Sequence, residues 1–400
     1  MLNLHFPSAA VFHRIQNFYI GPTVDLFWKE HQTELIESFA GKDIVLMGDG
    51  RMDSPGHSAQ YCSYSLMEME TKKVLSLVTM DKRVVDRKST TIEKEAFRRS
   101  IEELKAKGLG VKEVVTDAHM GIGYLMRTSY PEIKHSHDIW HVAKNLGKRI
   151  TKAGQKKGCK DLLRWAKHIV NHFWYACREA TGYMRFINIW GQVRHHACNE
   201  HEWILSEGEG PAECSHGDLE KDANRPDWLP KESLAAKAIN EIVLDKRLRN
   251  SYGYIENFRM TAEIEVFNNL ILMYCAKRFE YSPPAYRTRN QLAALDNNCH
   301  IDRPLLMNKK GEVVYHRTFN KKSGRWSVYP CKVNKNYQHV RDLLRRMLSA
   351  RLEDKMGMHR PKAMAADDPR RLSAHLAPVS PKATKELVSQ QMTRKKETEK

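Results

Sequence analysis

Two aspartates each follow a short apolar run that is typical of a buried strand. Asp49 comes directly after the run 43–48 (DIVLMG), and Asp117 directly after the run 111–116 (VKEVVT). If the runs are neighbouring strands, both carboxylates lie at one end of a sheet, where they repel each other unless a cation lies between them. Mg²⁺ prefers one or two carboxylates with water and phosphate oxygens. A pair of such ions about 3.5–4 Å apart can cleave a phosphodiester. The two aspartates therefore indicate metal-dependent phosphoryl chemistry.

This chemistry needs a third acid from a later helix, and the segment TAEIEVFNN offers Glu263 and Glu265. Glu265 is the candidate, and Asn268 and Asn269, three and four residues on, share its helix face. The residue pattern by itself does not separate the two glutamates. Each acid also has a plainer interpretation, since an aspartate followed by glycine often only shapes a turn and a helix glutamate is usually solvated.

Two histidines, His119 and His141, flank the second aspartate and the next block of sequence. A histidine near metal ions can tune a ligand or act on a leaving group. A core histidine with satisfied hydrogen bonds is the commoner case, so we assign neither residue a catalytic role.

The order of the predicted elements would bring the two aspartates together. Three strands are predicted at 43–48, 60–67 and 73–80, and their short connections favour an antiparallel meander. Further along, we predict helices at 92–107, 119–129 and 139–150, which alternate with strands at 111–116 and 133–138. This order predicts an α/β fold with an RNase H-like mixed five-stranded sheet, flanked by helices and interrupted by a helical insertion.

Composition and periodicity divide the chain into six predicted segments. They are an N-terminal helical segment at 1–40, the first part of the core at 41–150, a helical insertion at 151–250, the completion of the core with the third-acid helix at 251–300, a basic region at 301–360 and a disordered tail at 361–400. The tail is rich in Pro, Ala, Lys and Ser and has few aromatic residues, so it lacks the apolar surface that folding requires.

The chain is strongly basic, with 66 Lys and Arg against 48 Asp and Glu and a formal net charge of +18. Such a surplus favours a polyanionic partner, most often nucleic acid, although a basic protein without such a partner is the alternative. Positive residues concentrate at 144–167, and we predict that a helix there follows a DNA backbone. The residues assigned to this contact are Lys144, Lys148, Arg149, Lys152, Lys156 and Lys157.

A second basic stretch, at 309–337, interleaves Lys and Arg with aromatic residues. Arg325 and Trp326 are the residues that we assign to DNA here, because cationic and aromatic side chains together can contact phosphates and stack on bases. A small basic β-hairpin with no such role is an equally good interpretation.

Histidines and cysteines cluster in the predicted insertion. His196, His201, Cys214 and His216 could supply the four ligands of a Zn²⁺ site. Their spacing matches no standard zinc finger. We therefore favour the alternative, an insertion that is merely rich in histidine.

The remaining composition bears on the compartment. The eight cysteines are scattered and form no CxxC pair, which favours a reducing environment. The N-terminus lacks a signal-peptide pattern, and no apolar run approaches the ~20 residues of a membrane span. We expect an intracellular protein that is not secreted, has no membrane contact and has no small-molecule cofactor. A DNA-directed role would place it in the nucleus of a eukaryote, or otherwise in the cytoplasm and nucleoid.

Four blocks of the sequence resemble a known family. They are GDGRMDSPGHSAQY with Asp49, Gly56, His57 and Tyr61, VVTDAH with Asp117, YPEIKHSHDIWHVAKNL with Pro131, Asp138, Trp140, His141, Lys144 and Asn145, and EIEVFNN with Glu265 and Asn268. In order and content they are similar to the DDE transposases of bacterial insertion sequences with a long helical insertion, and to uncharacterised animal transposon-derived relatives. The resemblance covers roughly residues 1–300. The chain departs from it in having three residues, where one is usual, between His57 and Tyr61.

This resemblance implies a metal-dependent polynucleotidyl transferase that cleaves DNA and joins strands. Asp49, Asp117 and Glu265 would hold two Mg²⁺ or Mn²⁺ ions, and the match favours Glu265 over Glu263. Strand transfer by such enzymes commonly needs a homo-oligomer. One alternative is a domesticated, catalytically inactive DNA-binding protein. The other is an RNase H-like exonuclease or resolvase, which would place a fourth acid, such as Asp138, near the metal ions.

Overall fold

The computed structural model describes residues 7–54, 58–217, 219, 227–321, 323–359 and 382–398. Its centre is a five-stranded sheet with the order β3-β2-β1-β4-β5. The strands are β1 (Asp43–Asp53), β2 (Tyr61–Glu68), β3 (Val74–Asp81), β4 (Gly110–Thr116) and β5 (Lys134–His137). β2 is antiparallel to β1 and β3, whereas β4 is parallel to β1 and β5. The sheet is therefore mixed and RNase H-like, and the predicted fold class is confirmed.

Helices before and within the core follow the predicted order. They are α1 (Ala9–Ile15), the π-helix η1 (Gln16–Ile20), α2 (Gly21–Glu37), the 3-10 helix η2 (Lys82–Val85), α3 (Ser89–Ala106), α4 (Met120–Ser129) and α5 (Ile139–Gly154). The later helices are α6 (Leu162–Glu179), α7 (Tyr183–His196), α8 (Leu234–Val243), α9 (Lys246–Asn250), α10 (Tyr252–Ile255), α11 (Ala262–Tyr274), α12 (Pro283–His300), α13 (Gln338–Glu353) and α15 (Thr384–Thr398).

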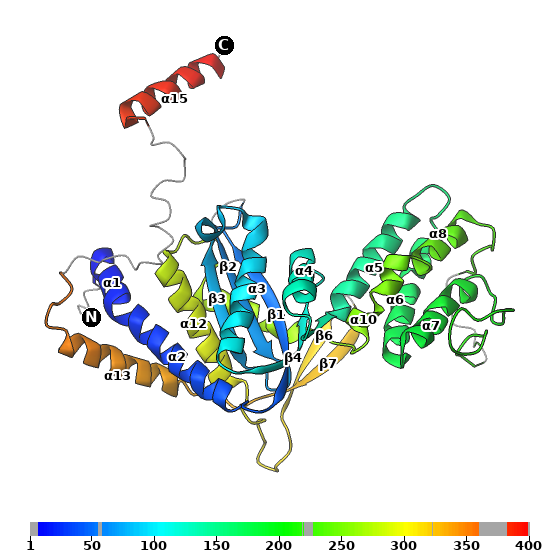
Figure 1. Ribbon diagram of the computed structural model, residues 1–400, viewed down its shortest axis with the longest axis horizontal. Coiled ribbons are helices and arrows are strands. Elements are labelled where there is room, and N and C mark those ends of the chain that lie inside the picture. Colours follow the sequence, from blue (N-terminus) through cyan, green and yellow to red (C-terminus); the bar gives the residue numbers. More distant parts are fainter. Residues whose placement is uncertain are drawn as a thin grey trace.

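Helices cover both faces of the sheet (Figure 1). On one face, α3 and α4 contribute residues such as Phe97 and Ile122 to an apolar core that includes Ile44 and Leu46 of β1. On the other face, α2, α11 and α12 pack against the alternate strand residues, such as Met47. The period-two alternation of β1 thus supplies both cores. It also places residues 47 and 49 on the face that α11 covers.

The helical insertion has a hydrophobic core of its own, beside the sheet (Figure 1). That core extends from Ile139 to Ile255, so α5 packs within the insertion, which begins earlier than the predicted boundary at 151. The chain returns to the sheet through Arg259, whose guanidinium pairs with the buried Glu113 of β4 at 2.8 Å. The insertion therefore leaves and rejoins the core next to β4 and β5.

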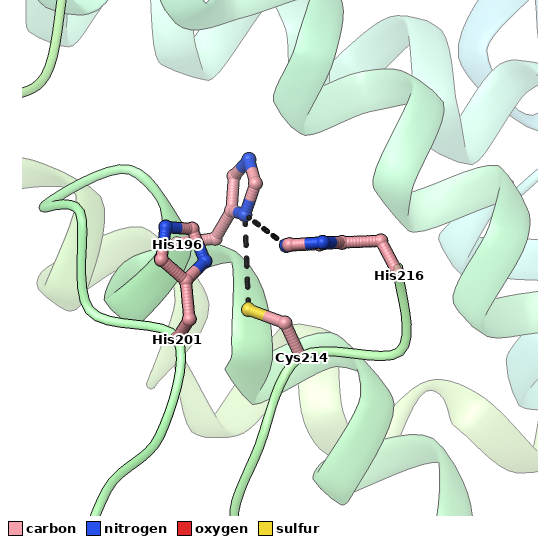
Figure 2. Close-up of side chains that lie close together, drawn as sticks. All are labelled: His196, His201, Cys214 and His216. Atoms are coloured by element: carbon pink, nitrogen blue, oxygen red, sulfur yellow. Dashed lines mark hydrogen bonds between the residues drawn. The ribbon is translucent and has the colours of Figure 1, made fainter. Parts of the chain in front are cut away.

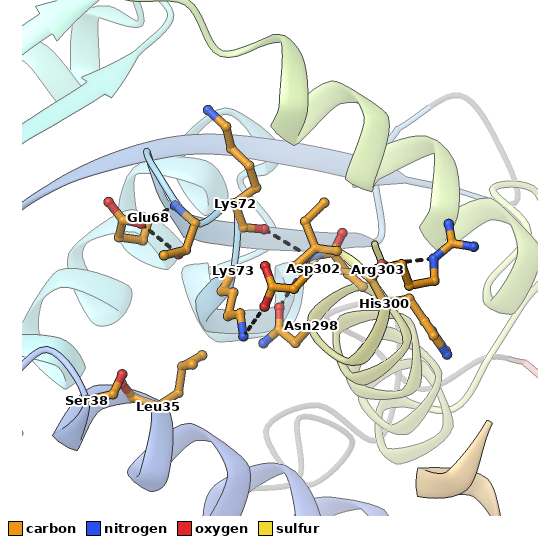
Figure 3. A network of polar contacts seen from close by, with 12 residues as sticks. Leu35, Ser38, Glu68, Lys72, Lys73, Asn298, His300, Asp302 and Arg303 are labelled. Atoms are coloured by element: carbon orange, nitrogen blue, oxygen red, sulfur yellow. Dashed lines mark hydrogen bonds and ion pairs between the residues drawn. The ribbon is translucent and has the colours of Figure 1, made fainter. Parts of the chain in front are cut away.

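Polar contacts close the β3 edge of the sheet against α12 (Figure 3). The Asn298 side chain accepts from the Val74 amide at 2.8 Å and donates to the Val74 carbonyl at 2.9 Å. Lys73 pairs with Asp302 at 2.6 Å. Because an unpaired edge strand invites association with other chains, these contacts give the edge backbone a partner within the chain.

The C-terminal region forms a hairpin and a helix. Strands β6 (Tyr315–Asn320) and β7 (Arg325–Pro330) pair antiparallel, and α13 then packs on α2, where Arg346 pairs with Glu30 at 2.6 Å. In the tail that we predicted to be disordered, residues 384–398 instead form α15, and residues 361–381, 399 and 400 lie outside the described residues. Within the described chain, no helix combines the length and the apolar character needed to cross a membrane.

Candidate functional site

Asp49 and Asp117 lie at the same end of two adjacent parallel strands, Asp49 within β1 and Asp117 directly after β4. Met47 of β1 is paired with Val115 of β4, and each aspartate lies two residues beyond its member of this pair. Residues two apart on a strand point to the same face, so Asp49 lies on the α11 side with Met47. Asp117, one residue past the end of β4, is close enough for its charge to act on Asp49. The sequence placed Asp49 at the end of its strand. In fact β1 continues to Asp53, and Asp49 lies opposite Ser65 of β2.

Glu265 comes to this sheet end in the first turn of α11. Asp49, Glu265, Asn268 and Asn269 line a common pocket, and the Asn268 side-chain amide donates to Asp49 Oδ2 at 2.8 Å. Glu263 takes a different direction, because its carboxylate lies 3.5 Å from Lys72 Nζ in the β2–β3 connection. The structure thus separates the two glutamates, which the residue pattern did not, and places Glu265 beside Asp49.

The acids repel one another at the sheet end. Burial, then the negative charge of Asp117 and, less, that of Glu265 raise the pKa of Asp49 to about 6, against the Gly50 amide and His141, which lower it. Carboxylates that are brought together in this way favour either a shared proton or a cation between them. Their oxygen atoms are the ligands that Mg²⁺ and Mn²⁺ prefer, so the donor set fits such ions.

A fourth acid, Glu93 of α3, reaches the same place, and the sequence analysis missed it. A Cβ atom added at Gly50 would lie 2.6 Å from Glu93 Cγ, so the glutamate side chain packs directly over the backbone next to Asp49. Burial, then the charges of Asp117 and Asp49, raise the pKa of Glu93 to about 7. The sequence held one signal, because Glu93 precedes the core residue Phe97 by four positions and so lies on the apolar face of α3.

Asp138, the acid that we named as a fourth metal ligand for a nuclease, serves another purpose. It is only 2% exposed and caps α5 by accepting from the Trp140 amide at 2.7 Å. It also accepts from Thr261 Oγ1 at 2.5 Å, just before α11 begins. Asp138 therefore joins the end of β5 to the start of the third-acid helix.

His141 connects Asp138 to Glu265. Its Nδ1 lies 3.1 Å from Asp138 Oδ2 and its Nε2 lies 3.7 Å from Glu265 Oε1. The hydrogen bond with Asp138 raises the pKa of His141, and the charges of Asp138, Glu265 and Asp117 add to this. A protonated His141 thus offsets part of the negative charge. His119 has a structural role, since its Nδ1 accepts from the Ile122 amide at 3.2 Å and caps α4.

A buried arginine holds α11 against β1. Arg51 donates to Asp53 Oδ1 at 3.0 Å, to the Asn268 carbonyl at 3.2 Å and to the Cys275 carbonyl at 2.9 Å. Tyr286 completes this network by donating to Asp53 Oδ2 at 2.8 Å. Because the two carbonyls lie in and just after α11, Arg51 fixes the position from which Glu265 reaches Asp49.

The residues assigned to DNA contact on α5 and after it are exposed: Lys144, Lys148, Arg149, Lys152, Lys156 and Lys157. Lys144, Lys148 and Lys152 recur every four residues and form one row on α5. Lys144 Nζ also lies 4.3 Å from the centre of the Trp140 ring, a cation–π contact. Arg149 pairs with Asp245, which neutralises part of this surface.

Arg325 and Trp326 begin strand β7 of the exposed hairpin. Trp326 is 69% exposed, and its ring centre lies 5.3 Å from that of Phe319 on β6. The basic β-hairpin that the sequence offered as one interpretation is present. Aromatic and cationic side chains are exposed on this hairpin, and its role in DNA contact stays a prediction.

The predicted zinc ligands, which the sequence analysis judged more simply explained by a histidine-rich insertion, come together in space (Figure 2). One ligand atom from each of His196, His201, Cys214 and His216 lies within 4.8 Å of all the others. In the part of the chain that the structure describes, the carboxylate oxygens at the sheet end do not form a group with such short separations between ligand atoms.

The motif block around the first aspartate is described only in part. Gly56 and His57 lie outside the described residues. Tyr61, at the start of β2, is buried, donates to the Tyr281 carbonyl at 2.6 Å and stacks on Tyr286.

In comparisons with known proteins, no protein-family model matches the chain and no curated protein matches it.

Proposed function

We propose that the chain is a DDE-type, metal-dependent polynucleotidyl transferase, either a transposase or a protein derived from one. The observation that carries the proposal is that Asp49 and Glu265 line one pocket at the sheet end. Burial, then the charge of Asp117 directly after β4, raise the pKa of Asp49 to about 6, and Glu265 adds to this. The sequence resemblance points to the same three residues, and RNase H-like topology is the scaffold on which they meet.

Asp49, Asp117 and Glu265 would hold Mg²⁺ or Mn²⁺. When bound, such an ion pair activates a water or a DNA 3′-hydroxyl and stabilises the leaving oxygen of a phosphodiester. Asn268 orients Asp49 through its 2.8 Å hydrogen bond. His141, whose pKa is raised by its hydrogen bond with Asp138, has Nε2 at 3.7 Å from Glu265 Oε1.

The row formed by Lys144, Lys148 and Lys152 begins on the helix that carries His141, so the same helix serves both the acidic site and a cationic surface. Phosphate contacts of this kind hold the DNA without reading its sequence. The hairpin with Arg325 and Trp326 would add stacking contacts. A homo-oligomer and a nuclear or nucleoid location follow from this proposal.

Glu93 favours a second candidate function, an RNase H-like exonuclease or resolvase. Enzymes of that class place a fourth acid near the metal ions, and Glu93 lies next to Asp49 in the way that such an acid would. The two candidates differ in their products. A transposase joins a DNA 3′-end to a second duplex, whereas an exonuclease shortens linear DNA and a resolvase cuts branched DNA.

The first experiment measures nicking of supercoiled DNA by the purified full chain with Mg²⁺ or Mn²⁺, next to an Asp117→Asn variant. We expect metal-dependent nicking in the wild type and a loss of at least about a hundredfold in the variant, because the amide cannot replace the carboxylate charge at the metal ions. Asp302→Asn is the matched control, because Asp302 pairs with Lys73 at the β3 edge of the sheet and does not line the acidic pocket, so nicking should be unchanged.

Further substrates separate the remaining alternatives. Joined products from a linear donor would support the transferase, and shortening of linear DNA or cutting of a four-way junction without joined products would support the nuclease. If neither metal ion yields cleavage of any substrate while both proteins still bind DNA in a salt-dependent way, the enzymatic proposal is wrong. The inactive DNA-binding alternative then stands.

A further inference from the structure

The four His and Cys side chains in the insertion have the spacing of a tetrahedral metal site. His196 Nδ1 lies 3.1 Å from His216 Nε2 and 3.7 Å from Cys214 Sγ. In a tetrahedral zinc site, with Zn–N of about 2.0–2.1 Å and Zn–S of about 2.3 Å, neighbouring ligand atoms are about 3.3–3.6 Å apart. All four ligand atoms lie within 4.8 Å of one another, so small side-chain shifts complete this arrangement.

Backbone pairing brings the ligands together from separate places. His196 is the last residue of α7, and His201 and Cys214 lie on two facing arms of the segment that follows it. The Cys214 amide donates to the His201 carbonyl at 2.9 Å, and the neighbouring residues Glu202 and Glu213 form an antiparallel bridge. The arms therefore hold His201 and Cys214 side by side at the end of α7, and His216 follows two residues later.

Hydrogen bonds at the rim of the cluster orient the imidazole rings. Nδ1 of His216 donates to the Gly217 carbonyl at 2.7 Å, which leaves the lone pair of Nε2 facing His196. Nε2 of His201 lies 3.1 Å from Asn199 Oδ1, an arrangement that fits metal binding through Nδ1. A metal-ligating histidine typically donates its other ring N–H to a carbonyl or carboxylate, which fixes its tautomer and orientation.

The segment that carries the ligands has little apolar packing to hold it. Ile204 and Leu205 are 95% and 79% exposed. The apolar wall lies instead behind the cluster, where the Trp228 ring centre is 5.4 Å from His196 and 5.5 Å from His201. Polar contacts also tie the segment to α7: Glu207 pairs with Arg194, and the Asn188 side-chain amide donates to Ser206 Oγ at 2.7 Å. A metal ion bound by His196 of α7 and by the segment would add a further link between the two.

We propose that His196, His201, Cys214 and His216 bind one structural Zn²⁺ ion, which fastens residues 199–217 to the end of α7. Three imidazoles and one thiolate are ligands that suit Zn²⁺ and differ from the carboxylates at the sheet end. Four protein ligands fill a tetrahedral shell and leave no position for a substrate, so the ion stabilises the insertion and takes no part in catalysis.

The test is the zinc content of the full chain, purified without chelator and measured by inductively coupled plasma mass spectrometry. We expect about one zinc ion per chain in the wild type and nearly none in Cys214→Ser. Cys198→Ser is the matched control, because Cys198 lies just after α7 but outside the cluster, and it should keep the full zinc content. Equal zinc in all three proteins, or none in the wild type after reconstitution with Zn²⁺, would overturn the proposal.

A spectroscopic measurement on the wild type keeps the test independent of how the variants fold. Replacing the ion by Co²⁺ should give the intense visible bands of a tetrahedral site and a thiolate-to-cobalt charge-transfer band in the near ultraviolet. His216→Ala should weaken the visible bands, whereas His316→Ala, an exposed residue on β6, should not. Octahedral spectra without a thiolate band would refute the site. The acids at the sheet end are not part of the zinc site, so this outcome would not affect the proposed polynucleotidyl transferase function.

Discussion

At the scale of single residues, the acidic site depends on how closely carboxylates are packed. Asp49 and Glu93 approach each other from opposite faces of the sheet because residue 50 is glycine, and any Cβ there would collide with Glu93. Their pKa values of about 6 and about 7 reflect burial first and the negative charge of Asp117 second. Asp138, by contrast, accepts hydrogen bonds from the first turn of α5 and from Thr261. It therefore lies near the site without belonging to the group of mutually repelling acids.

We predict that Glu93→Gln lowers metal-dependent nicking by about 10- to 100-fold, the usual effect of losing a group that supports metal ligands. In metal-free buffer the same change should leave the protein equally stable or slightly more stable, because it removes a repulsive charge. Glu95→Gln is the control, since Glu95 on the same helix pairs with Arg98 and Arg99 in solvent. Unchanged nicking in Glu93→Gln together with a lower unfolding midpoint would give Glu93 a purely structural role.

At the scale of elements, α11 is the part that must be placed accurately, because Glu265 is the acid that does not come from the sheet. Two contacts place it. Arg51 of β1 holds the carbonyls of Asn268 and Cys275, and Asp138 holds Thr261 at the N-terminal end of the helix. Both are buried polar contacts, in which an unpaired group costs about 1–3 kcal/mol.

We predict that Arg51→Lys lowers the free energy of unfolding by about 2 kcal/mol, because one ammonium group cannot reach both helix carbonyls and Asp53. It should lower nicking by more than the unfolded fraction explains, since Glu265 is then held less firmly beside Asp49. Urea unfolding and nicking assays on the same preparation separate the two effects. The control is Arg83→Lys, because Arg83 pairs with Asp81 on β3, away from α11. Equal losses of activity in both variants at matched stability would contradict this role of Arg51.

At the scale of the whole molecule, two sets of buried groups make stability depend on pH with opposite signs. Burial lowers the pKa of His135 to about 3 and that of His137 to about 4, from 6.5 in the unfolded chain. As the pH falls below about 6.5, the unfolded state takes up protons that the folded state refuses, and stability is lost. The raised pKa values of Asp49 and Glu93 act in the other direction, so in metal-free protein they cost stability as the pH rises toward 7.

Because the two effects oppose each other in the wild type, we predict how the pH dependence of its unfolding free energy differs from that of a variant without the His135 imidazole. As the pH falls from about 6.5 to 4, the free energy of unfolding should fall more steeply in the wild type than in His135→Gln. The difference between the two slopes should be up to about 1.4 kcal/mol per pH unit. Glutamine can keep a hydrogen bond with Thr116, which lies 2.9 Å from His135 Nε2. Urea titrations of the metal-free proteins measure this difference, with His316→Gln on the exposed hairpin as the control. If the unfolding free energies of wild type and His135→Gln change with pH in parallel, burial does not prevent the protonation of His135.

Local signals in the sequence determined the order of the elements and two of the acids. A short apolar run predicted the start of β1, and helical periodicity predicted α3, because these patterns depend only on the local repeat of the backbone. Asp49 and Asp117 follow from such patterns, since each comes directly after an apolar run in the sequence. The helical character of 139–255 was also predictable, although its start was not, because only the packing of Ile139 and Ala143 assigns α5 to the insertion.

Tertiary structure decided everything that depends on contacts between distant segments. Glu265 is distinguished from Glu263 by Lys72, which lies far from both in the sequence and takes Glu263 away from the site. Glu93 joins the acids only because α3 crosses the sheet at Gly50. The His and Cys cluster has no regular spacing, and it becomes compact only because two arms of one long segment pair beside the end of α7. Spacing along a chain records local geometry, whereas these meetings depend on where the whole chain folds back on itself.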